Sequence, residues 1–516
     1  MARWDDGYVT DVVYTSNFYR ECTPSWLATA CLLLGHRPPD LTRPFRYADF
    51  GCGHGFTALT VAATSPRAEV WGFDFNPAHV ESARNLAAAA GLTNVHFEEA
   101  SFGDLAAMSP EAMPPFDFIV SHGVLSWISR ENRQHLLDLL GRRLRPGGLA
   151  YVSYNVSTGW SGMAPLRGLM RMLAETSPDR TDVVATAVLD YVDQLKASGA
   201  LFFQANPGIE ARLAEIRRQD PRYIAHEFLN KEWYPADFAE VANAMAERKC
   251  SYIGSATLAE NIDAVAVPNA VQPLMANARD PLLRETLRDF GSGQGFRRDI
   301  YRRGMAPMPA AEHQIVIDDL TIGWTGQAAG EKVTIGTPIG SLTGRDEIYR
   351  PLLAMLEARP VSVRQARTAQ SFAGPRLLDL LQAVALLIGS GFANPVLPGG
   401  ISEDARQSAE RLNLAIAAMN ARGGDLPRVV SPLMGAAISV DLLVSLLVGE
   451  LLKGHPPEVE ALTTLILAQL TQGGRTVQRD GQPISDPAQA RSIVADVLRT
   501  GLEQRGPLLR EWGVLK

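Results

Sequence analysis

The sequence predicts an α/β fold, in which a doubly wound sheet carries a helical insertion and is followed by a mostly helical C-terminal domain. Three observations lead to this prediction. Strand-like and helix-like stretches alternate from Tyr47 to Tyr154 with the short connections of an α/β sheet. A glycine-rich run, Asp49 to Gly55, falls between the first strand and the first helix of that alternation. After Ser157 the pattern becomes largely helical.

The glycine-rich run forms a notch at a strand-to-helix turn. Phe45 to Phe50 reads as a buried strand and Phe56 to Ala63 as the helix that follows. Glycines at alternate positions between them allow a ligand to approach the backbone closely, and the amides at the start of the helix face the same space. The run therefore predicts a nucleotide-sized site at Gly51, Cys52, Gly53 and Gly55.

An acidic residue follows the second predicted strand, Ala68 to Phe73. Asp74 lies 74 − 55 = 19 positions after Gly55, where doubly wound sheets place a carboxylate that accepts hydrogen bonds from ribose hydroxyls. Phe75 and Asn76 come directly after it, so we expect them beside the same ligand.

The spacing of the glycines distinguishes between cofactors. A dinucleotide site needs G-x-G-x-x-G, so that the pyrophosphate reaches the start of the helix, whereas this chain has G-x-G-x-G. Asp49, two positions before the first glycine, would repel phosphate and suits a cationic group such as the ammonium of an amino acid. The segment resembles the glycine-rich motif of class I S-adenosylmethionine (SAM) methyltransferases, which implies SAM as the cofactor. A tight turn without a ligand would need the same glycines.

The tips of the third and fourth strands complete the predicted cofactor site. The fourth strand, Phe116 to Ser121, runs into His122, which we expect to pack beside the cofactor rather than act as a general base. Class I methyltransferases often hold the adenine amino group with an acid after the third strand. Here Ser101 offers a hydroxyl and Phe102 an aromatic face in place of that acid, and Asp104 is a nearby carboxylate that could substitute for it. The residues expected to contact the cofactor from these tips are Ser101, Phe102, Ser121 and His122.

The residues before the first strand are rich in aromatic side chains, spaced over a loop and then a helix from Pro24 to Leu34. Aromatic residues of this kind usually dock a helix on a sheet. The alternative is a flap that covers the cofactor, for which Tyr14 is the best candidate.

The helical pattern after the sheet marks an insertion. Strand character returns at Ser251 to Leu258 and Gly295 to Arg302, which we interpret as the last strands of the sheet, on an antiparallel edge. The insertion would then lie over the cofactor cleft, where it could select substrates. After residue 304 a linker leads to a short β region that includes His313 to Ile322, and Asp346 to Pro395 suggests a winged-helix-like arrangement. The predicted domains are 1–155 (SAM-binding catalytic domain with an N-terminal flap), 156–250 (helical insertion), 251–303 (final strands of the catalytic sheet) and 304–516 (C-terminal interaction domain).

Several short segments resemble one bacterial family. They are His122 to Trp127 (HGVLSW), Tyr154 to Trp160 (YNVSTGW), Ile224 to Leu229 (IAHEFL) and Tyr252 to Ala256 (YIGSA). They look like bacterial methyltransferases that carry a so-called methyltransferase regulatory domain, and the chain is similar to the rickettsial protein lysine methyltransferases that modify outer-membrane proteins. The resemblance implies a seven-stranded SAM-methyltransferase sheet, a SAM-dependent methyltransferase activity and a protein lysine as the acceptor.

The acceptor side of the site is predicted from aromatic residues near the fourth and fifth strand tips. A lysine nitrogen needs a free lone pair, and desolvation in an apolar pocket makes its neutral form easier to reach. We expect four catalytic residues there, with Tyr154 and Asn155 orienting the amine; the alternative is that each packs the insertion onto the sheet. The four are Trp127, Tyr154, Asn155 and Trp160. Two alternative functions remain. One is a methyltransferase for a small molecule or natural-product peptide, and the other is a SAM-binding scaffold without turnover.

Charge and cysteine content argue against other classes. A net charge of −7 argues against a general nucleic-acid binder. The four cysteines match neither a C-x-x-C pair nor a zinc spacing, so we predict no metal and a cytoplasmic location. Apolar stretches such as Ala436 to Val448 are too short to span a bilayer. The expected partner is a protein or peptide substrate, with a small molecule and a homodimer left open.

Overall fold

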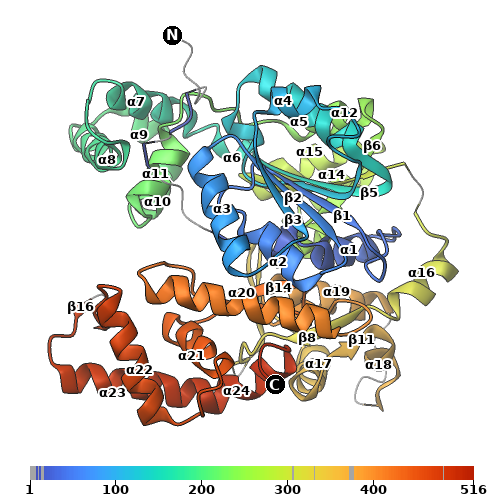
Figure 1. Ribbon diagram of the computed structural model, residues 1–516. Helices are drawn as coiled ribbons and strands as arrows, with labels where there is room; N and C mark the ends of the chain where they lie inside the picture. Colours follow the sequence, from blue (N-terminus) through green and yellow to red (C-terminus); the bar gives the residue numbers. More distant parts are fainter. Residues whose placement is uncertain are drawn as a thin grey trace.

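The computed structural model describes residues 7–9, 11–12, 17–304, 307–330, 332–370, 377–479 and 482–516. Its centre is a seven-stranded sheet with the strand order β3-β2-β1-β4-β5-β7-β6 (Figure 1). The first five strands are parallel, and β7 runs antiparallel between β5 and β6. The predicted antiparallel edge therefore consists of β7 alone, since β6 pairs antiparallel with β7 and so shares the direction of β5. The strands are β1 (Arg46–Phe50), β2 (Glu69–Asp74), β3 (Val95–Glu99), β4 (Phe116–Ser121), β5 (Leu144–Asn155), β6 (Cys250–Ser255) and β7 (Phe296–Arg303).

Helices cover both faces of this sheet, so its central strands β1 and β4 are buried along almost their whole length. One face packs against α1 (Pro24–Leu33), α2 (Phe56–Thr64) and α3 (Pro77–Ala89). The other packs against α4 (Phe102–Ala107), α5 (Arg130–Arg143) and α12 (Phe238–Glu247). The predicted doubly wound α/β fold is confirmed.

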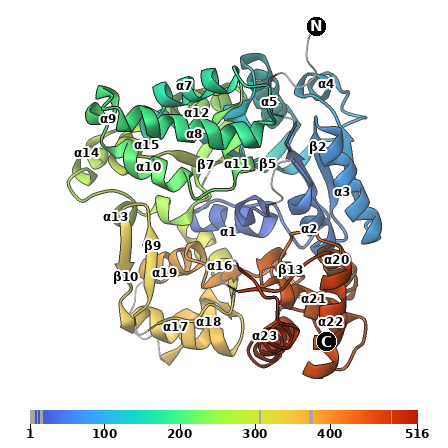
Figure 2. The same ribbon diagram turned by 90° about the vertical axis from the view of Figure 1, so that its left-hand side faces the viewer.

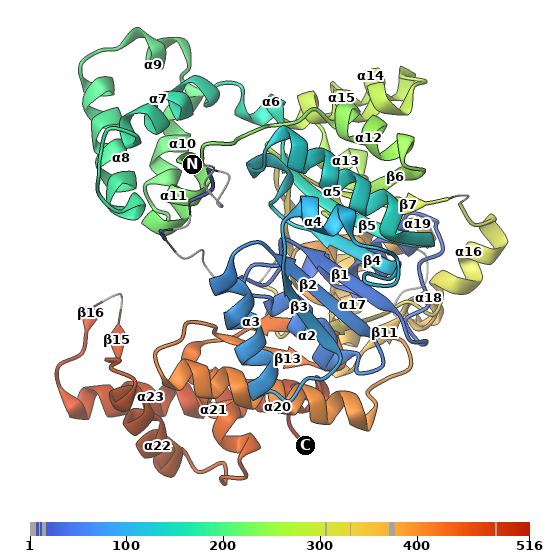
Figure 3. The same ribbon diagram turned by 45° about the horizontal axis from the view of Figure 1, so that its top comes forward.

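The insertion after β5 is a helical unit with its own apolar core. Figure 3 shows it to one side of the sheet. Trp160 ties it back to the sheet, because its indole Nε1 donates to the carbonyl oxygen of Gly295 at 3.0 Å. Its helices are α6 (Ser157–Trp160), α7 (Ala164–Ala174), α8 (Thr181–Ala197), α9 (Leu201–Ala205), α10 (Gly208–Ile216) and α11 (Pro221–Phe228).

Three helices lie between β6 and β7 and precede the C-terminal region. They are α13 (Asp263–Ala266), α14 (Gln272–Asn277) and α15 (Pro281–Ser292). The C-terminal region begins with α16 (Ala310–Ile317), so the strand expected from His313 onward is wrong for its first half. The Nε2 atom of His313 lies 2.8 Å from the carbonyl oxygen of Leu32, so this helix packs on the end of α1.

The C-terminal region lies beneath the sheet domain (Figure 2). Its first half holds a three-stranded sheet of order β11-β8-β12, and the winged-helix-like arrangement stays a prediction. Its second half packs through α20 on α2 and α3. The elements of the first half are β8 (Thr321–Trp324), β9 (Thr334–Thr337), β10 (Gly340–Thr343), α17 (Asp346–Ala358), β11 (Val361–Ser362), α18 (Val363–Thr368), α19 (Leu377–Gly389) and β12 (Ala393–Pro395). Those of the second are α20 (Glu403–Ala421), β13 (Arg428–Ser431), β14 (Ala436–Ser439), α21 (Leu442–Leu452), α22 (Val459–Gln472), β15 (Gln478–Arg479), β16 (Gln482–Pro483), α23 (Pro487–Thr500) and α24 (Gly506–Glu511).

Two chemical features bear on the class of protein. The four cysteines are free thiols. Within the described ranges, every helix is too short or too polar to cross a bilayer.

Candidate active site

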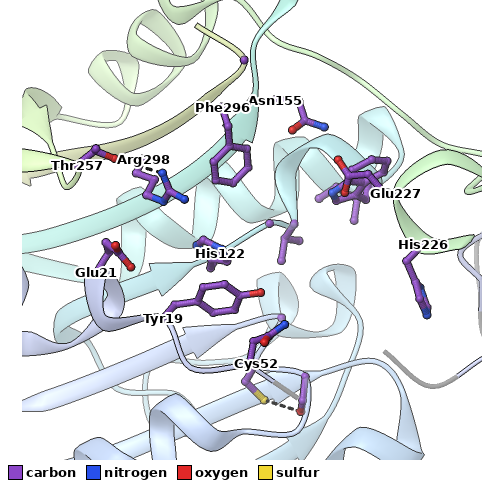
Figure 4. A pocket seen from close by; sticks show the side chains of 18 of the residues that line it. Tyr19, Glu21, Cys52, His122, Asn155, His226, Glu227, Thr257, Phe296 and Arg298 are labelled. Atoms are coloured by element: carbon purple, nitrogen blue, oxygen red, sulfur yellow. Dashed lines mark hydrogen bonds between the residues drawn. The ribbon is translucent and has the colours of Figure 1, made fainter. Parts of the chain in front are cut away.

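A cavity of about 1420 Å³ opens at the carboxyl ends of the parallel strands (Figure 4). Its wall gathers the glycine-rich turn after β1, the tip of β2, the loops after β3 and β4, helix α11 of the insertion, and the hairpin between β9 and β10. Pockets for single small ligands usually hold about 300–1,000 Å³. The space is therefore sufficient for a nucleotide-sized cofactor together with part of a second substrate.

The glycine-rich turn forms the floor of this cavity. Gly51, Gly53 and Gly55 all have positive φ angles, of 80°, 54° and 69°. A Cβ atom on Gly53 would meet nothing within 4 Å, so open space lies above this residue. A Cβ atom on Gly51 would lie 2.4 Å from Val124, and one on Gly55 would lie 2.5 Å from the ring of Phe97. Gly53 thus leaves room for a ligand, whereas the other two glycines allow the turn itself to pack.

Asp74 stands at the tip of β2 and holds the turn in place. One carboxylate oxygen accepts a hydrogen bond from the amide of Gly53 at 2.8 Å. The other accepts from the amide of Asn76 at 2.9 Å and lies 3.2 Å from Nδ1 of His79. Asn76 lies outside the cavity wall, because its side chain caps α3 by accepting from the amide of Ala78 at 3.0 Å.

Asp49 lies behind the turn, buried and outside the cavity wall. Burial, and then the nearby charge of Asp74, raise the pKa of Asp49 to about 7. Among the described residues no cationic side chain pairs with it. An ammonium group above the turn would offset the unfavourable burial of this charge. The Asp49 carboxylate therefore suits the ammonium of the amino-acid end of SAM.

The loop after β3 lines the adenine side of the predicted site. Ser101 and Asp104 form a capping box at the start of α4, in which the Ser101 hydroxyl donates to the Asp104 carboxylate at 2.6 Å. Both residues and Phe102 line the cavity. The Ser101 hydroxyl is therefore already engaged, and the open carboxylate oxygen of Asp104 is the better acceptor for an amino group.

His122 is a packed neutral ring at the tip of β4. It stacks on Tyr19 with 3.7 Å between ring centroids, and its Nδ1 lies 2.7 Å from the Tyr151 hydroxyl. Burial, with the charge of Arg298 added, lowers the pKa of His122 to about 3. At neutral pH this ring therefore has little affinity for a proton, which disfavours a general-base role. Ser121 faces away from the cavity and donates to the carbonyl oxygen of Phe50 at 3.0 Å.

The prediction that Tyr154 orients the amine is wrong. Side chains alternate between the faces of a strand, so Asn155 reaches the cavity while Tyr154 is buried on the α12 side of the sheet. There its hydroxyl donates to Asp299 at 2.5 Å. Arg297 completes this buried network by donating to Asp299 at 2.8 Å and to Asp289 at 2.5 Å.

The sequence prediction therefore divides into three groups. The predicted residues that line the common cavity are Gly51, Cys52, Gly53, Asp74, Phe75, Ser101, Phe102, His122, Trp127, Asn155 and Trp160. Those that lie behind its wall are Asp49, Gly55, Asn76, Ser121 and Tyr154. Tyr14 lies outside the described residues, so its role as a flap stays a prediction.

Sequence reasoning missed a carboxylate that the insertion brings to the cavity. Helix α11 places Glu227 on the wall beside Asn155. Burial raises the pKa of Glu227 to about 7, and the amide of Asn155 and the guanidinium groups of Arg212 and Arg167 oppose that rise. Its neighbour His226 points elsewhere, with Nε2 2.9 Å from the carbonyl oxygen of Val12, so the two residues do not converge on a metal. The only sequence signal was the IAHEFL segment, which carried the family resemblance without a role for Glu227.

Fold and cavity together define a class of enzyme. A sheet in which β7 lies antiparallel between β5 and β6, with an open glycine turn after β1 and an acid at the tip of β2, is that of the class I SAM methyltransferases. Matches to family models agree with this class. A methyltransferase domain matches residues 48–148, and a predicted methyltransferase regulatory domain matches residues 220–303.

Comparison with known proteins identifies the family. The chain is 31% identical over 512 residues to uncharacterized protein sll1526 of Synechocystis, with 99% of each chain covered. A trans-aconitate 2-methyltransferase of Methylobacterium radiotolerans is 35% identical over 138 residues, which are 27% of this chain and 47% of that protein. The structure of PKMT2 from Rickettsia typhi in complex with AdoHcy superimposes with a TM-score of 0.71 and 21% identity, over 97% of this chain and 99% of that one. The chain belongs to the SAM-dependent methyltransferases that carry a methyltransferase regulatory domain, and SAM is its cofactor.

Proposed function

We propose that this enzyme transfers the methyl group of SAM to a lysine nitrogen of a protein or peptide. The observation that carries the proposal is the aromatic wall on the acceptor side of the cavity. Trp127, Trp160 and Phe296 at the start of β7 line the cavity, whereas Tyr154 does not. The fold shared with PKMT2, and the resemblance to rickettsial lysine methyltransferases, support the same acceptor.

The aromatic wall answers the main energetic problem of methylating an amine. Bound SAM supplies an electrophilic methyl group on a sulfonium whose thioether leaves readily, so positioning dominates the chemistry. A lysine with a pKa of about 10.4 costs roughly 4 to 5 kcal/mol to deprotonate at neutral pH. Exclusion of water by aromatic faces lowers that cost, and the same faces attract the incoming cation by about 0.5 to 2 kcal/mol.

The size and borders of the cavity favour a chain-like acceptor over a compact one. Thr337 and Ser390 of the C-terminal region share the wall with the sheet and the insertion. An extended peptide could therefore contact all of these parts while one side chain reaches the methyl group. A compact small molecule or natural-product peptide is the alternative, in which the insertion closes over the whole substrate. The match to trans-aconitate 2-methyltransferase covers 27% of this chain and 47% of that protein, which is too little to assign its acceptor to this chain.

Transfer of radiolabel separates these two functions. We expect the enzyme, incubated with SAM carrying a tritiated methyl group and a bacterial lysate, to place label in acid-precipitable protein. Prior acetylation of the lysate with acetic anhydride, which blocks lysine nitrogens, should remove that label. Label that stays in the acid-soluble metabolites would favour the small-molecule alternative. Label in protein that survives acetylation would contradict lysine as the acceptor.

The proposal includes a cytoplasmic location and a role for each part of the chain. The four free thiols are consistent with a reducing cytoplasm. We retain 1–155 as the SAM-binding part, 156–250 as the substrate-selecting insertion, 251–303 as the closing strands and 304–516 as an interaction domain.

A further inference from the structure

Two polar side chains from separate parts of the fold face each other at the acceptor end of the cavity. Asn155 ends β5, and Glu227 comes from α11 of the insertion, 72 positions later (227 − 155 = 72). Figure 4 shows both on one side of His122, with Glu21 and Arg298 on the other. The pair therefore lies apart from the opposite, Arg298-lined end of the space.

Asn155 lacks a partner that its burial demands. The residue is 3% exposed, and within the described ranges its Nδ2 donates no hydrogen bond. A buried amide left unpaired costs about 1–3 kcal/mol. The amide lowers the pKa of Glu227, yet the two groups do not meet the usual geometry of a hydrogen bond. A third polar group placed between them would satisfy both side chains.

Glu227 is a carboxylate without a dedicated cation. The two nearby guanidinium groups are engaged elsewhere in the insertion. Arg167 donates to the carbonyl oxygen of Asn230 at 2.6 Å and stacks on Trp233, and Arg212 lies over the ring of Trp160 at 5.0 Å. In the described part of the chain neither forms an ion pair with Glu227. Its half-buried charge thus faces an aromatic cavity and attracts a cation from it.

We propose that Glu227 binds the ammonium group of the acceptor lysine and removes its proton, while Asn155 orients the nitrogen toward the methyl group. The inference rests on the proposed function and assigns the residues that receive its substrate. A proton first passes from the ammonium to the carboxylate, which leaves a neutral amine and a carboxylic acid. The nitrogen lone pair then forms the N–C bond as the C–S bond breaks, and the electron pair of that bond stays on the departing thioether sulfur.

The groups around Glu227 allow it to titrate near neutral pH. Burial lowers the pKa of Arg167 only to about 10, so this guanidinium is charged at neutral pH. Burial raises the pKa of both nearby tyrosines, so these stay neutral. With a pKa of about 7, Glu227 is protonated below pH 7 and is a competent base above it. The titratable and charged groups that face it are Arg167 of α7, Arg212 of α10, Tyr223 of α11 and Tyr8 in the segment before α1.

The pH dependence of Glu227→Gln tests this assignment. At limiting lysate protein, the initial rate of label transfer is proportional to kcat/KM. For the wild type we expect a rise up to about pH 7 and a plateau from there toward pH 10, because the ionised base accepts the protonated lysine directly. Glu227→Gln should lower the rate at pH 7.5 by about 100-fold or more. Its residual rate should rise about tenfold per pH unit, because only the rare neutral lysine can then react.

Glu215→Gln is the matched control, since Glu215 is exposed on the neighbouring helix α10. It should keep the wild-type rate and profile. Glu227→Gln should bind SAM within about threefold of the wild type and unfold at the same temperature, which separates a catalytic loss from a folding defect. A wild-type rate and plateau in Glu227→Gln would overturn this inference while leaving lysine methylation intact. Absence of label from lysine in the wild type would overturn the proposed function and this inference together.

Discussion

Replacement of Gly53 by arginine is expected to abolish SAM binding. Gly53 is the glycine whose added Cβ would meet open space, so a long side chain there fills the volume that the cofactor needs. Its amide also donates a hydrogen bond to Asp74, the residue predicted to bind the ribose, so the turn lies next to that site. We expect calorimetry to show a loss in affinity of roughly 100-fold or more, which corresponds to about 2.7 kcal/mol.

Gly199→Arg provides a control with the same change in side chain. Gly199 also has a positive φ, of 79°, and open space around its Cβ position, but it lies between α8 and α9 of the insertion. Both variants should therefore carry a similar backbone strain, and only Gly53→Arg should lose SAM. Equal affinity in the two variants would contradict the placement of the cofactor over the glycine-rich turn.

Loss of Arg297 should strongly destabilise the catalytic sheet. Its guanidinium is 3% exposed and pairs with Asp289 and Asp299, whose side chains are 4% and 0% exposed. Arg297→Met would leave these carboxylates buried without a cation, which costs about 3–5 kcal/mol. We expect thermal unfolding to begin about 5–10 °C lower than in the wild type. Arg279→Met, at an exposed position between α14 and α15, should have little effect.

Lowering the pH should rescue Arg297→Met in part. Burial raises the pKa of Asp289 to about 7 even with the arginine in place. A carboxyl whose pKa is higher in the folded protein than in the unfolded chain destabilises the fold where it is ionised, and this penalty disappears as pH falls below the folded value. The difference in unfolding temperature between variant and wild type should therefore shrink from pH 8 to pH 6. An unfolding temperature equal to that of the wild type at both pH values would show that the network contributes nothing.

The residues that line the SAM side of the cavity could be predicted, because each of them lies close in sequence to the end of a strand. The glycine-rich turn, the acid after β2 and the loop after β3 each follow a strand directly in sequence. The carboxyl ends of parallel strands meet at one edge of a sheet, so alternation of strands and helices is enough to bring these residues together. Eight of the residues predicted to bind the cofactor line the same cavity for this reason.

The side of the cavity proposed to receive the methyl acceptor depends on contacts between residues far apart in sequence, which no local sequence pattern reveals. Tyr154 and Asn155 are adjacent, and only the pleat of β5 against β7 decides which of them faces the cavity. Glu227 reaches the site because the insertion places α11 on the cavity wall, although its neighbours in sequence read as an ordinary amphipathic helix. Likewise, the segment from His313 to Ile322 was expected to be a strand, but a short apolar run does not distinguish strand from helix.

Mass spectrometry of the methylated product tests the central claim most directly. SAM with a trideuterated methyl group would be incubated with the enzyme and a bacterial lysate, and the proteins digested and sequenced by fragmentation. The account predicts that the heavy methyl groups lie on lysine side-chain nitrogens, and that Glu227→Gln lowers their number while Glu215→Gln does not. Heavy methyl groups on oxygen, on carbon or on a free metabolite would contradict it, and the aromatic wall around Trp127 and Trp160 would then be the packing surface for a compact substrate.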